Sequence, residues 1–182
     1  MDIYSIDYDN TLCFTGHRPH KLYGYEYSTG GNLRILKNLK ALIVRFIEKR
    51  GVTTFISGMA LGIDMWSAQI ILSLKKEYPH IKLVCAIPCI EQYKKWNSKD
   101  IEIYHEILEQ ADLVHYVSDE PYTRWCMTVR DKWMVDNSRF TIAVWDGVKD
   151  GGTWQTVKYA RKRQRPIVQL NPKTFKMNFL NA

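Results

Sequence analysis

The sequence has few cysteines, and they are scattered along the chain, at Cys13, Cys85, Cys89 and Cys126. The segment Cys85-Ala86-Ile87-Pro88-Cys89 lacks the two-residue gap between cysteines that is typical of zinc knuckles and redox motifs. Four scattered cysteines are also too few for the disulfide framework of a small secreted scaffold. We therefore expect buried, reduced thiols and no metal site.

Long hydrophobic runs are missing as well. The longest candidate, from Leu39 to Ile47, is interrupted by Lys40 and Arg45 and is far shorter than the ~20 apolar residues that a membrane span needs. The chain begins Met1-Asp2-Ile3-Tyr4, without the basic segment and apolar stretch of a secretory signal. We expect a cytoplasmic protein with no membrane partner.

Acidic residues are in the minority. The chain carries 26 Lys and Arg against 19 Asp and Glu, a formal net charge of +7 over 182 residues. This excess favours anionic partners, such as nucleotides, phosphates or nucleic acid, without choosing among them. No repeat, low-complexity tract or linker is visible, so we expect one domain over residues 1–182, in which residues 1–11 form an N-terminal extension or an edge strand.

Short apolar runs alternate with longer helical patterns, which predicts an α/β protein. Six strands are expected, at residues 12–15, 54–57, 83–87, 113–117, 141–145 and 167–170. Five helices are expected between them, over about 33–49, 63–77, 99–110, 123–136 and 153–164. A helix that connects two parallel strands crosses over the sheet in a right-handed sense, so this order gives a mostly parallel sheet with helices on both faces. We therefore expect a single Rossmann-like three-layer domain.

Ligands of open parallel sheets bind beyond the carboxyl ends of the strands, so the loops at those ends are the candidate site. The first strand is followed by Thr15, Gly16, His17 and Arg18, a small turn with two potential cations that suits a phosphate. An ordinary turn with a solvated arginine is the alternative interpretation.

Two further strand ends open into helices through small residues. The second strand is followed by Ser57-Gly58-Met59-Ala60-Leu61-Gly62-Ile63-Asp64, and the fifth strand by a loop that ends in Gly151-Gly152-Thr153. Small side chains let backbone N–H groups approach an anion at a helix N-terminus. Asp64 is expected to brace its loop, because its carboxylate would repel a phosphate. Two such helix starts on one sheet edge favour a ligand with more than one polar anchor, such as a nucleotide.

These residues carry a resemblance to a known family. Ser57 to Asp64 resembles the Ser-Gly-x-Ala-x-Gly-Ile-Asp signature of the SLOG superfamily, which unites the DNA-processing protein DprA with the LOG nucleoside-monophosphate phosphoribohydrolases. Thr15 to Pro19, together with Pro88, Gln92 and Trp96, is similar to the small, free-standing YpsA-like branch. The resemblance implies a Rossmann-like protein that binds nucleotides or ADP-ribose derivatives, often as a dimer or larger oligomer. Some members of the superfamily sense or sequester nucleotide signals of anti-phage defence.

The sequence departs from both named relatives. LOG hydrolases have a Glu three positions after the Thr of their glycine-rich turn, whereas Thr153 is followed by Trp154-Gln155-Thr156. Without that acid, N-glycosidic cleavage would have to use another carboxylate, such as Glu91 or Asp64. DprA is longer, so DNA binding would rest on one basic helix end, formed by Lys158, Arg161, Lys162, Arg163 and Arg165. Nucleic acid is therefore the less favoured partner.

A competing motif lies near the N-terminus. Asp7-Tyr8-Asp9-Asn10-Thr11 is similar to the Asp-x-Asp-x-Thr nucleophile loop of haloacid-dehalogenase-type phosphatases, in which the first Asp attacks phosphorus beside a bound Mg²⁺. This Mg-dependent phosphatase is retained as a further alternative.

The favoured hypothesis is a homo-oligomeric protein that binds a phosphorylated nucleotide or ADP-ribose-type ligand, as a sensor or sequestering protein without turnover. A cyclic ADP-ribose-like defence signal is one such ligand. Trp96 is the candidate for stacking the base. No catalytic residue, metal or cofactor is assigned. The expected ligand contacts are Thr15, Gly16, His17, Arg18, Ser57, Gly58, Met59, Ala60, Gly62, Asp64, Pro88, Gln92, Trp96, Gly151, Gly152 and Thr153.

Overall fold

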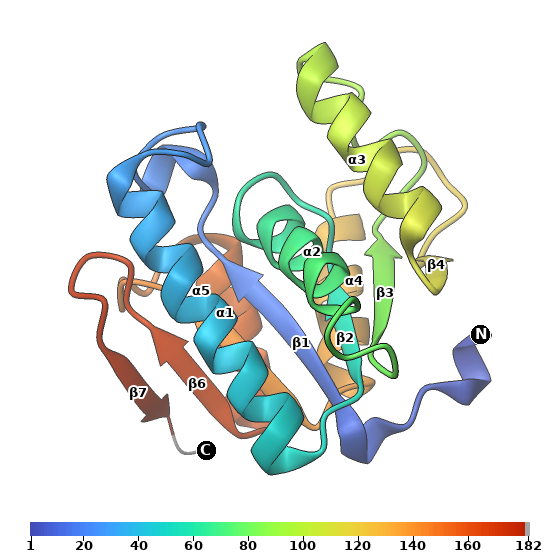
Figure 1. Cartoon of the computed structure of the whole chain (residues 1–182). Coiled ribbons are helices and arrows are strands. Elements are labelled where there is room, and N and C mark those ends of the chain that lie inside the picture. Colours follow the sequence, from blue (N-terminus) through green and yellow to red (C-terminus); the bar gives the residue numbers. More distant parts are fainter. Residues whose placement is uncertain (181–182) are drawn as a thin grey trace.

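A sheet of seven strands runs through the middle of the molecule in the order β4-β3-β2-β1-β5-β6-β7 (Figure 1). The computed structural model describes residues 1–180. The strands are β1 (Thr11–Gly16), β2 (Thr54–Ser57), β3 (Lys82–Ile87), β4 (Leu113–Tyr116), β5 (Phe140–Val144), β6 (Ile167–Leu170) and β7 (Met177–Leu180). All neighbours pair in parallel except β6 and β7, which are antiparallel.

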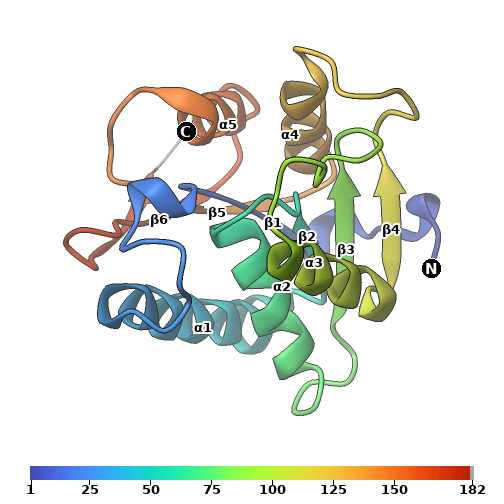
Figure 2. The same cartoon turned by 90° about the horizontal axis from the view of Figure 1, so that it is seen from above.

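Helices cover both faces of the sheet, as Figure 2 shows from above. They are α1 (Gly30–Arg50), α2 (Ile63–Leu74), α3 (Ser98–Gln110), α4 (Cys126–Asp136) and α5 (Gly151–Lys162). The first three lie on one face, and α4 and α5 lie on the other. The predicted α/β Rossmann-like fold with a mostly parallel sheet is therefore confirmed.

The central strand β1 contributes buried side chains to the core on both faces of the sheet. Leu12 and Phe14 belong to the cluster under α1, α2 and α3, whereas Cys13 belongs to the cluster under α4 and α5. Successive side chains of a strand point to opposite faces, so a fully apolar run is what a strand buried on both sides requires. In register, Leu12 stands between Phe55 of β2 and Phe140 of β5.

The long helix α1 forms because its apolar residues recur at spacings of three and four. Ile35, Leu39, Ile43 and Ile47 are all buried against the sheet. The helix ends at Gly51, whose φ of 66° is left-handed, a conformation that favours glycine at a helix C-terminus.

The two ends of the chain lie outside the pattern of alternating strands and helices. Residues before β1 form two short 3₁₀ helices, Ile3–Ser5 and Tyr8–Asn10, and residues 1–10 contain no strand. The carboxylates of Asp2 and Asp7 accept hydrogen bonds from backbone N–H groups of these turns, which explains why the segment is helical and not an extended strand. At the other end, β7 was not expected; it pairs with β6 as an antiparallel edge strand.

Within residues 1–180, no helix combines the length and the apolar character that crossing a membrane requires.

Candidate functional site

A cavity of about 360 Å³ opens at the carboxyl ends of β1 and β5, between the start of α2 and the starts of α4 and α5. We call it the site cavity. In the sheet, β1 has β2 as its neighbour on one side and β5 on the other, so the strand order reverses at β1. The cavity therefore lies at the topological switch point, where open α/β sheets bind ligands. Its lining residues are Thr15, Gly16, His17, Arg18, His20, Lys21, Ala60, Asp64, Met127, Arg130, Asp131, Asp150, Gly151, Gly152 and Thr153.

A buried ion network forms the wall beside α4. The Arg130 side chain is only 5% exposed, and its Nη1 lies 3.7 Å from Oδ2 of Asp64. Its Nε donates to Oδ1 of Asp131 at 2.8 Å, and Nη1 also donates to the carbonyl of Gly58. The second oxygen of Asp131 accepts from the Thr156 hydroxyl at 3.0 Å. Arg130 thus ties the loop after β2 to α4.

The carboxyl group of Asp64 has an altered affinity for protons. Burial raises its pKa to about 6 from an ordinary value of 3.8, and the nearby charge of Asp131 acts in the same direction. The charges of Arg130 and Arg18 oppose this rise. With a pKa of about 6, the carboxyl group of Asp64 changes charge about two pH units above the usual range of an aspartate. Its place beside Arg130 agrees with the expected bracing role.

Arg18 differs from Arg130 in that its side chain has no partner in the described part of the chain. Its guanidinium lines the cavity, yet it makes no hydrogen bond or ion pair within residues 1–180. Burial lowers the pKa of Arg18 despite the attraction of Asp64, which means that removal from water is the largest influence on its charge. A half-buried cation without a protein acceptor is suited to an anionic ligand.

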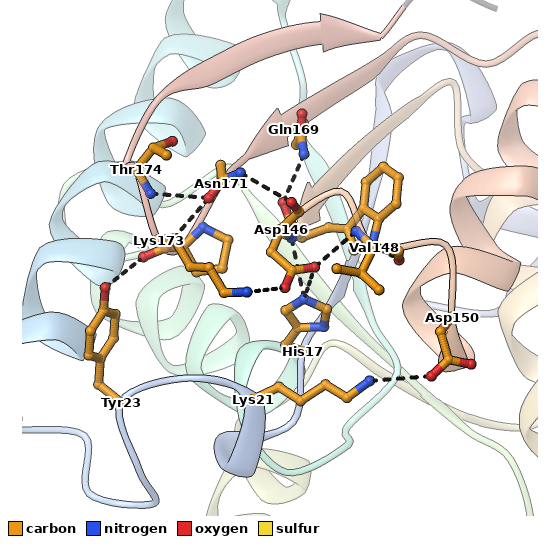
Figure 3. Close-up of polar contacts among 12 residues, drawn as sticks. His17, Lys21, Tyr23, Asp146, Val148, Asp150, Gln169, Asn171, Lys173 and Thr174 are labelled. Atoms are coloured by element: carbon orange, nitrogen blue, oxygen red, sulfur yellow. Dashed lines mark hydrogen bonds and ion pairs between the residues drawn. The ribbon is translucent and has the colours of Figure 1, made fainter.

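The neighbouring His17 is held by other loops (Figure 3). Its Nε2 lies 3.0 Å from Oδ1 of Asp146, and the other oxygen of Asp146 accepts from Lys173 at 2.8 Å. Burial lowers the pKa of His17 against the influence of Asp146, which favours a neutral ring. Burial acts to raise the pKa of Asp146, but the bonds from Lys173, the Val148 N–H and His17 hold it well below its usual range. This cluster fixes the β1 loop that carries Arg18.

Close packing explains one glycine of the lining. A Cβ at Gly16 would overlap the side chain of Ile63, at the start of α2, so any larger residue would push the loops after β1 and β2 apart.

Another wall of the cavity is formed by the start of α5. This helix begins at Gly151 without a side-chain cap from Asp150, and Nζ of Lys21 lies 3.9 Å from Oδ2 of Asp150. The first amides of α5 therefore have no side-chain cap.

Nine of the expected contact residues line the site cavity: Thr15, Gly16, His17, Arg18, Ala60, Asp64, Gly151, Gly152 and Thr153. Three others lie behind its wall. The Ser57 hydroxyl is fully buried, where it donates to the Asp64 carbonyl and accepts from the Met59 N–H. A Cβ at Gly58 would overlap the Arg130 guanidinium. Ser57, Gly58 and Met59 thus shape the loop, and the hydroxyl expected to donate to a ligand is used inside the protein.

The remaining expected contacts lie farther along the sheet edge and do not line this cavity. Pro88 is buried, and Gln92 donates to the Met59 carbonyl at 3.0 Å. Trp96 is half-buried with its ring edge-on to Tyr104, so it packs on the core at the place where base stacking was expected. Gly62 lines a different pocket, described below.

The phosphatase motif lies elsewhere. Asp7 and Asp9 are exposed and precede β1, at the opposite end of the strand from the cavity. Asp7 is engaged in capping a turn, and Asp9 pairs with Arg139 at 3.5 Å. Ligands of open parallel sheets bind beyond the carboxyl ends of the strands, so the geometry weighs against that alternative. Within residues 1–180, no group of three or more His, Cys, Asp or Glu side chains is placed to hold a metal ion.

Sequence reasoning did not assign six lining residues: His20, Lys21, Met127, Arg130, Asp131 and Asp150. Arg130 and Asp131 lie one turn inside α4, far in sequence from the end of the preceding strand, and they belong to no recognisable motif. The signal that could have pointed to them is an adjacent Arg-Asp pair in a helix that follows an edge strand.

Fold and cavity together define a Rossmann-like protein with its candidate site at the switch point of the sheet. The model of the YspA SLOG family matches residues 12–175. The chain belongs to this family, as the resemblance in its glycine-rich loop had predicted.

Curated relatives cover most of the chain. A UPF0398 protein of Brevibacillus brevis is 35% identical over 153 residues, which are 84% of this chain and 81% of that protein. A UPF0398 protein of Halalkalibacterium halodurans is 30% identical over 155 residues, 85% of this chain and 82% of that protein.

Solved structures share the fold at low sequence identity. DNA processing protein A from Helicobacter pylori, described for its single-stranded DNA binding mode, matches with a TM-score of 0.61 and 16% identity, over 93% of this chain and 69% of that one. DprA from Streptococcus pneumoniae matches with a TM-score of 0.61 and 15% identity, over 88% of this chain and 50% of that one. At such identities the likeness shows the fold alone.

Proposed function

We propose that this protein binds a phosphorylated nucleotide or ADP-ribose-type ligand in the site cavity and holds it without turnover, as a sensor or a sequestering protein. The observation that carries the proposal is Arg18, a half-buried guanidinium that lines the cavity without an acceptor within residues 1–180. Its planar fork of N–H donors fits two phosphate oxygens at once.

The start of α5 supplies the second anchor. Gly151, Gly152 and Thr153 line the same cavity as Arg18, and the first amides of α5 have no side-chain cap. Helix N-termini favour anions through these amides and the helix dipole. A phosphate between Arg18 and α5 would also be near Lys21.

Binding without turnover is favoured because the carboxylates of the cavity have protein partners. Thr156 stands where LOG hydrolases have their Glu, and its hydroxyl donates to Asp131. Asp64 and Asp131 both face Arg130. Glu91, the other acid considered for a hydrolase, pairs with Lys94 at 3.1 Å and does not line the cavity. Hydrolysis through Asp64 is the enzyme alternative.

The ligand class follows from the family rather than from any bound molecule. The SLOG resemblance implies nucleotides or ADP-ribose derivatives, and cyclic ADP-ribose-like signals of anti-phage defence belong to that class. The cavity of about 360 Å³ can hold a phosphate and part of a nucleoside.

The test is isothermal titration with AMP, GMP, ADP-ribose and cyclic ADP-ribose isomers on the wild type, Arg18→Met and Arg50→Met. Arg50→Met removes the same charge at the exposed end of α1, at the opposite edge of the sheet. We expect at least one ligand to bind the wild type and Arg50→Met equally, and to bind Arg18→Met at least tenfold more weakly, a loss of ~1.4 kcal/mol that one charged hydrogen bond supplies. Equal binding to all three proteins would contradict the proposal.

Turnover is measured on the same samples. After incubation, the protein is heat-denatured and the released molecules are analysed by mass spectrometry. Intact ligand is the expected result, whereas a free base with ribose phosphate would establish the hydrolase alternative.

A second candidate function is the binding of single-stranded DNA, the ligand named for the Helicobacter pylori structure of the same fold. It is favoured by a groove of about 260 Å³ between α4 and α5, which borders the site cavity at Asp131. Lys132, Lys158 and Lys162 line this lysine groove and have no acidic partner within residues 1–180. Among the other cations of the basic helix end, Arg163 pairs with Asp136 at 2.8 Å.

Fluorescence anisotropy with a labelled single-stranded oligonucleotide tests this second function. Phosphate contacts from the lysines should make binding weaken steeply with salt, and Lys158→Glu combined with Lys162→Glu should abolish it. Nucleotide binding should not change in that variant. Absence of oligonucleotide binding by the wild type at low salt would exclude this candidate.

A further inference from the structure

A second pocket lies directly behind one wall of the site cavity. It has a volume of about 250 Å³ and is lined by residues of the loop before α1, of α2 and of α3, including Tyr25, Tyr27, Trp66 and Gln69. We call it the tyrosine pocket. In Figure 1, α2 and α3, which line it, lie on the same side of the sheet as α1, which follows the lining loop.

The two pockets share a partition that is one layer of chain thick. Pro19 lines the tyrosine pocket, whereas Arg18 and His20 on either side of it line the site cavity. In the same way, Gly62 lines the tyrosine pocket and Ala60, two residues earlier, lines the site cavity. A Cβ at Gly62 would come within 2.9 Å of both the Pro19 ring and the His17 carbonyl. The two segments therefore touch, so a ligand that occupies both pockets has to pass over this thin partition.

The wall formed by α2 offers polar groups that the protein does not use. Trp66 is only 7% exposed, yet its indole N–H makes no hydrogen bond within residues 1–180 and is not sealed from solvent. Gln69 is half-buried, and its amide likewise has no partner in the described chain. Residues three apart lie on one face of a helix, so both groups serve the same pocket.

Aromatic rings give the pocket a flat contact surface. The Tyr27 ring stands edge-on to Trp66 at 6.0 Å between centroids, and Tyr25 is exposed at the rim. The indole N–H is only a donor, while the Gln69 amide can donate and accept. An occupant with flat faces, a hydrogen-bond acceptor and a mixed polar edge satisfies all of these groups. A nucleobase has these properties.

We infer that the tyrosine pocket holds the nucleobase of the ligand whose phosphate lies in the site cavity. This inference rests on the proposed function and adds to it where the base is recognised. It places the base beside Trp66 and Gln69, and not beside Trp96, whose ring packs on Tyr104.

Matched ligands and variants test the inference. Ribose 5-phosphate keeps the phosphate and one ribose but lacks a base, so it is compared with AMP, GMP and ADP-ribose by titration calorimetry. The variants are Gln69→Leu, which keeps the size of the side chain, and Tyr27→Ala, on a half-exposed ring. Gln110→Leu, on the exposed end of α3, is the control.

We expect each pocket variant to weaken the tightest nucleotide about fivefold or more, the effect of losing one stacking or hydrogen-bonding contact to a base. Ribose 5-phosphate should bind the wild type and every one of these variants alike. Unchanged nucleotide affinity in both Gln69→Leu and Tyr27→Ala, with the Arg18 dependence intact, would overturn this inference alone. Absence of binding by every phosphorylated compound would overturn the proposed function and this inference together.

Discussion

Arg130 organises the site cavity at the scale of single residues. It is buried, it contacts Asp64, Asp131 and the Gly58 carbonyl, and the lack of a side chain at Gly58 gives its guanidinium room. Removing one member of a buried ion network leaves the others unpaired, which costs more than the network contributes. Variants of Arg130 or Gly58 would therefore change stability as well as binding, and Arg18 is the better residue for a test of binding.

Asp64 predicts a dependence of stability on pH. Burial, opposed by Arg130, raises its pKa to about 6 in the folded protein, so the folded state holds a proton that the unfolded chain releases from about pH 4 upward. Stability should therefore fall as pH rises from about 4 to about 6, and the fall should be absent from Asp64→Asn. We expect the free energy of unfolding of the wild type, relative to Asp64→Asn, to decrease by on the order of 2 kcal/mol over this window, measured by urea denaturation.

Asp150→Asn is the control for this series, because its carboxylate is exposed at the start of α5. It should follow the wild type at every pH. Parallel curves for the wild type and Asp64→Asn would show that burial does not raise the pKa of Asp64.

Residues at strand ends were predictable from sequence, and residues inside helices were not. Arg18 and Gly152 could be assigned to one cavity because parallel strands place their carboxyl ends together. Arg130 could not, because only the tertiary packing of α4 brings it to Gly58. Ser57 was assigned to the right loop but to the wrong partner, since a hydroxyl beside a helix start can donate to a ligand or to the Asp64 carbonyl.

At the scale of elements, α1 is held by one apolar face. Leu39 is fully buried, while Leu33 in the first turns of the same helix is 48% exposed. This contrast permits a paired test of how the helix is fixed to the sheet.

Leu39→Ala should destabilise the protein by ~2 to 5 kcal/mol, because it removes buried apolar contacts and leaves a cavity. Leu33→Ala, with the same chemical change on an exposed position, should cost less than ~1 kcal/mol. Chemical denaturation of both variants measures the difference. Similar losses in the two variants would mean that α1 does not pack on the sheet through the face described.

Most helices and six strands followed from periodicity, but the ends of the chain did not. The segment of β7, Met177-Asn178-Phe179-Leu180, lies at the sheet edge with mostly exposed side chains, so it shows no clear apolar alternation. Its strand character comes from hydrogen bonds to β6, from Ile167 to Leu170, which a local pattern does not reveal.

At the scale of the whole molecule, the family resemblance implies an oligomer, and exposed apolar side chains at the start of α4 allow this expectation to be tested. Trp125 and Val129 are four residues apart at the start of α4 and are 63% and 50% exposed. Neighbouring exposed apolar side chains on one helix face favour association.

We predict a homo-oligomer in solution, measured by size-exclusion chromatography with light scattering. Trp125→Lys should shift the protein toward the monomer, because a charge would have to be buried at the contact. Tyr4→Lys, at a residue that is 96% exposed in the N-terminal segment, should leave the mass unchanged. A monomeric wild type at all concentrations tested would contradict the prediction.

Backbone amide NMR of the ¹⁵N-labelled protein, titrated with the tightest nucleotide of the panel, tests most directly whether a phosphate is held in the site cavity. We predict the largest shifts at the amides of Gly16, Gly152 and Thr153, with little change in the 3₁₀ turn at Ile3–Ser5 at the opposite edge of the sheet. Largest shifts along the lysine groove with none at Gly16 and Gly152, or no shifts at all, would contradict the proposed site.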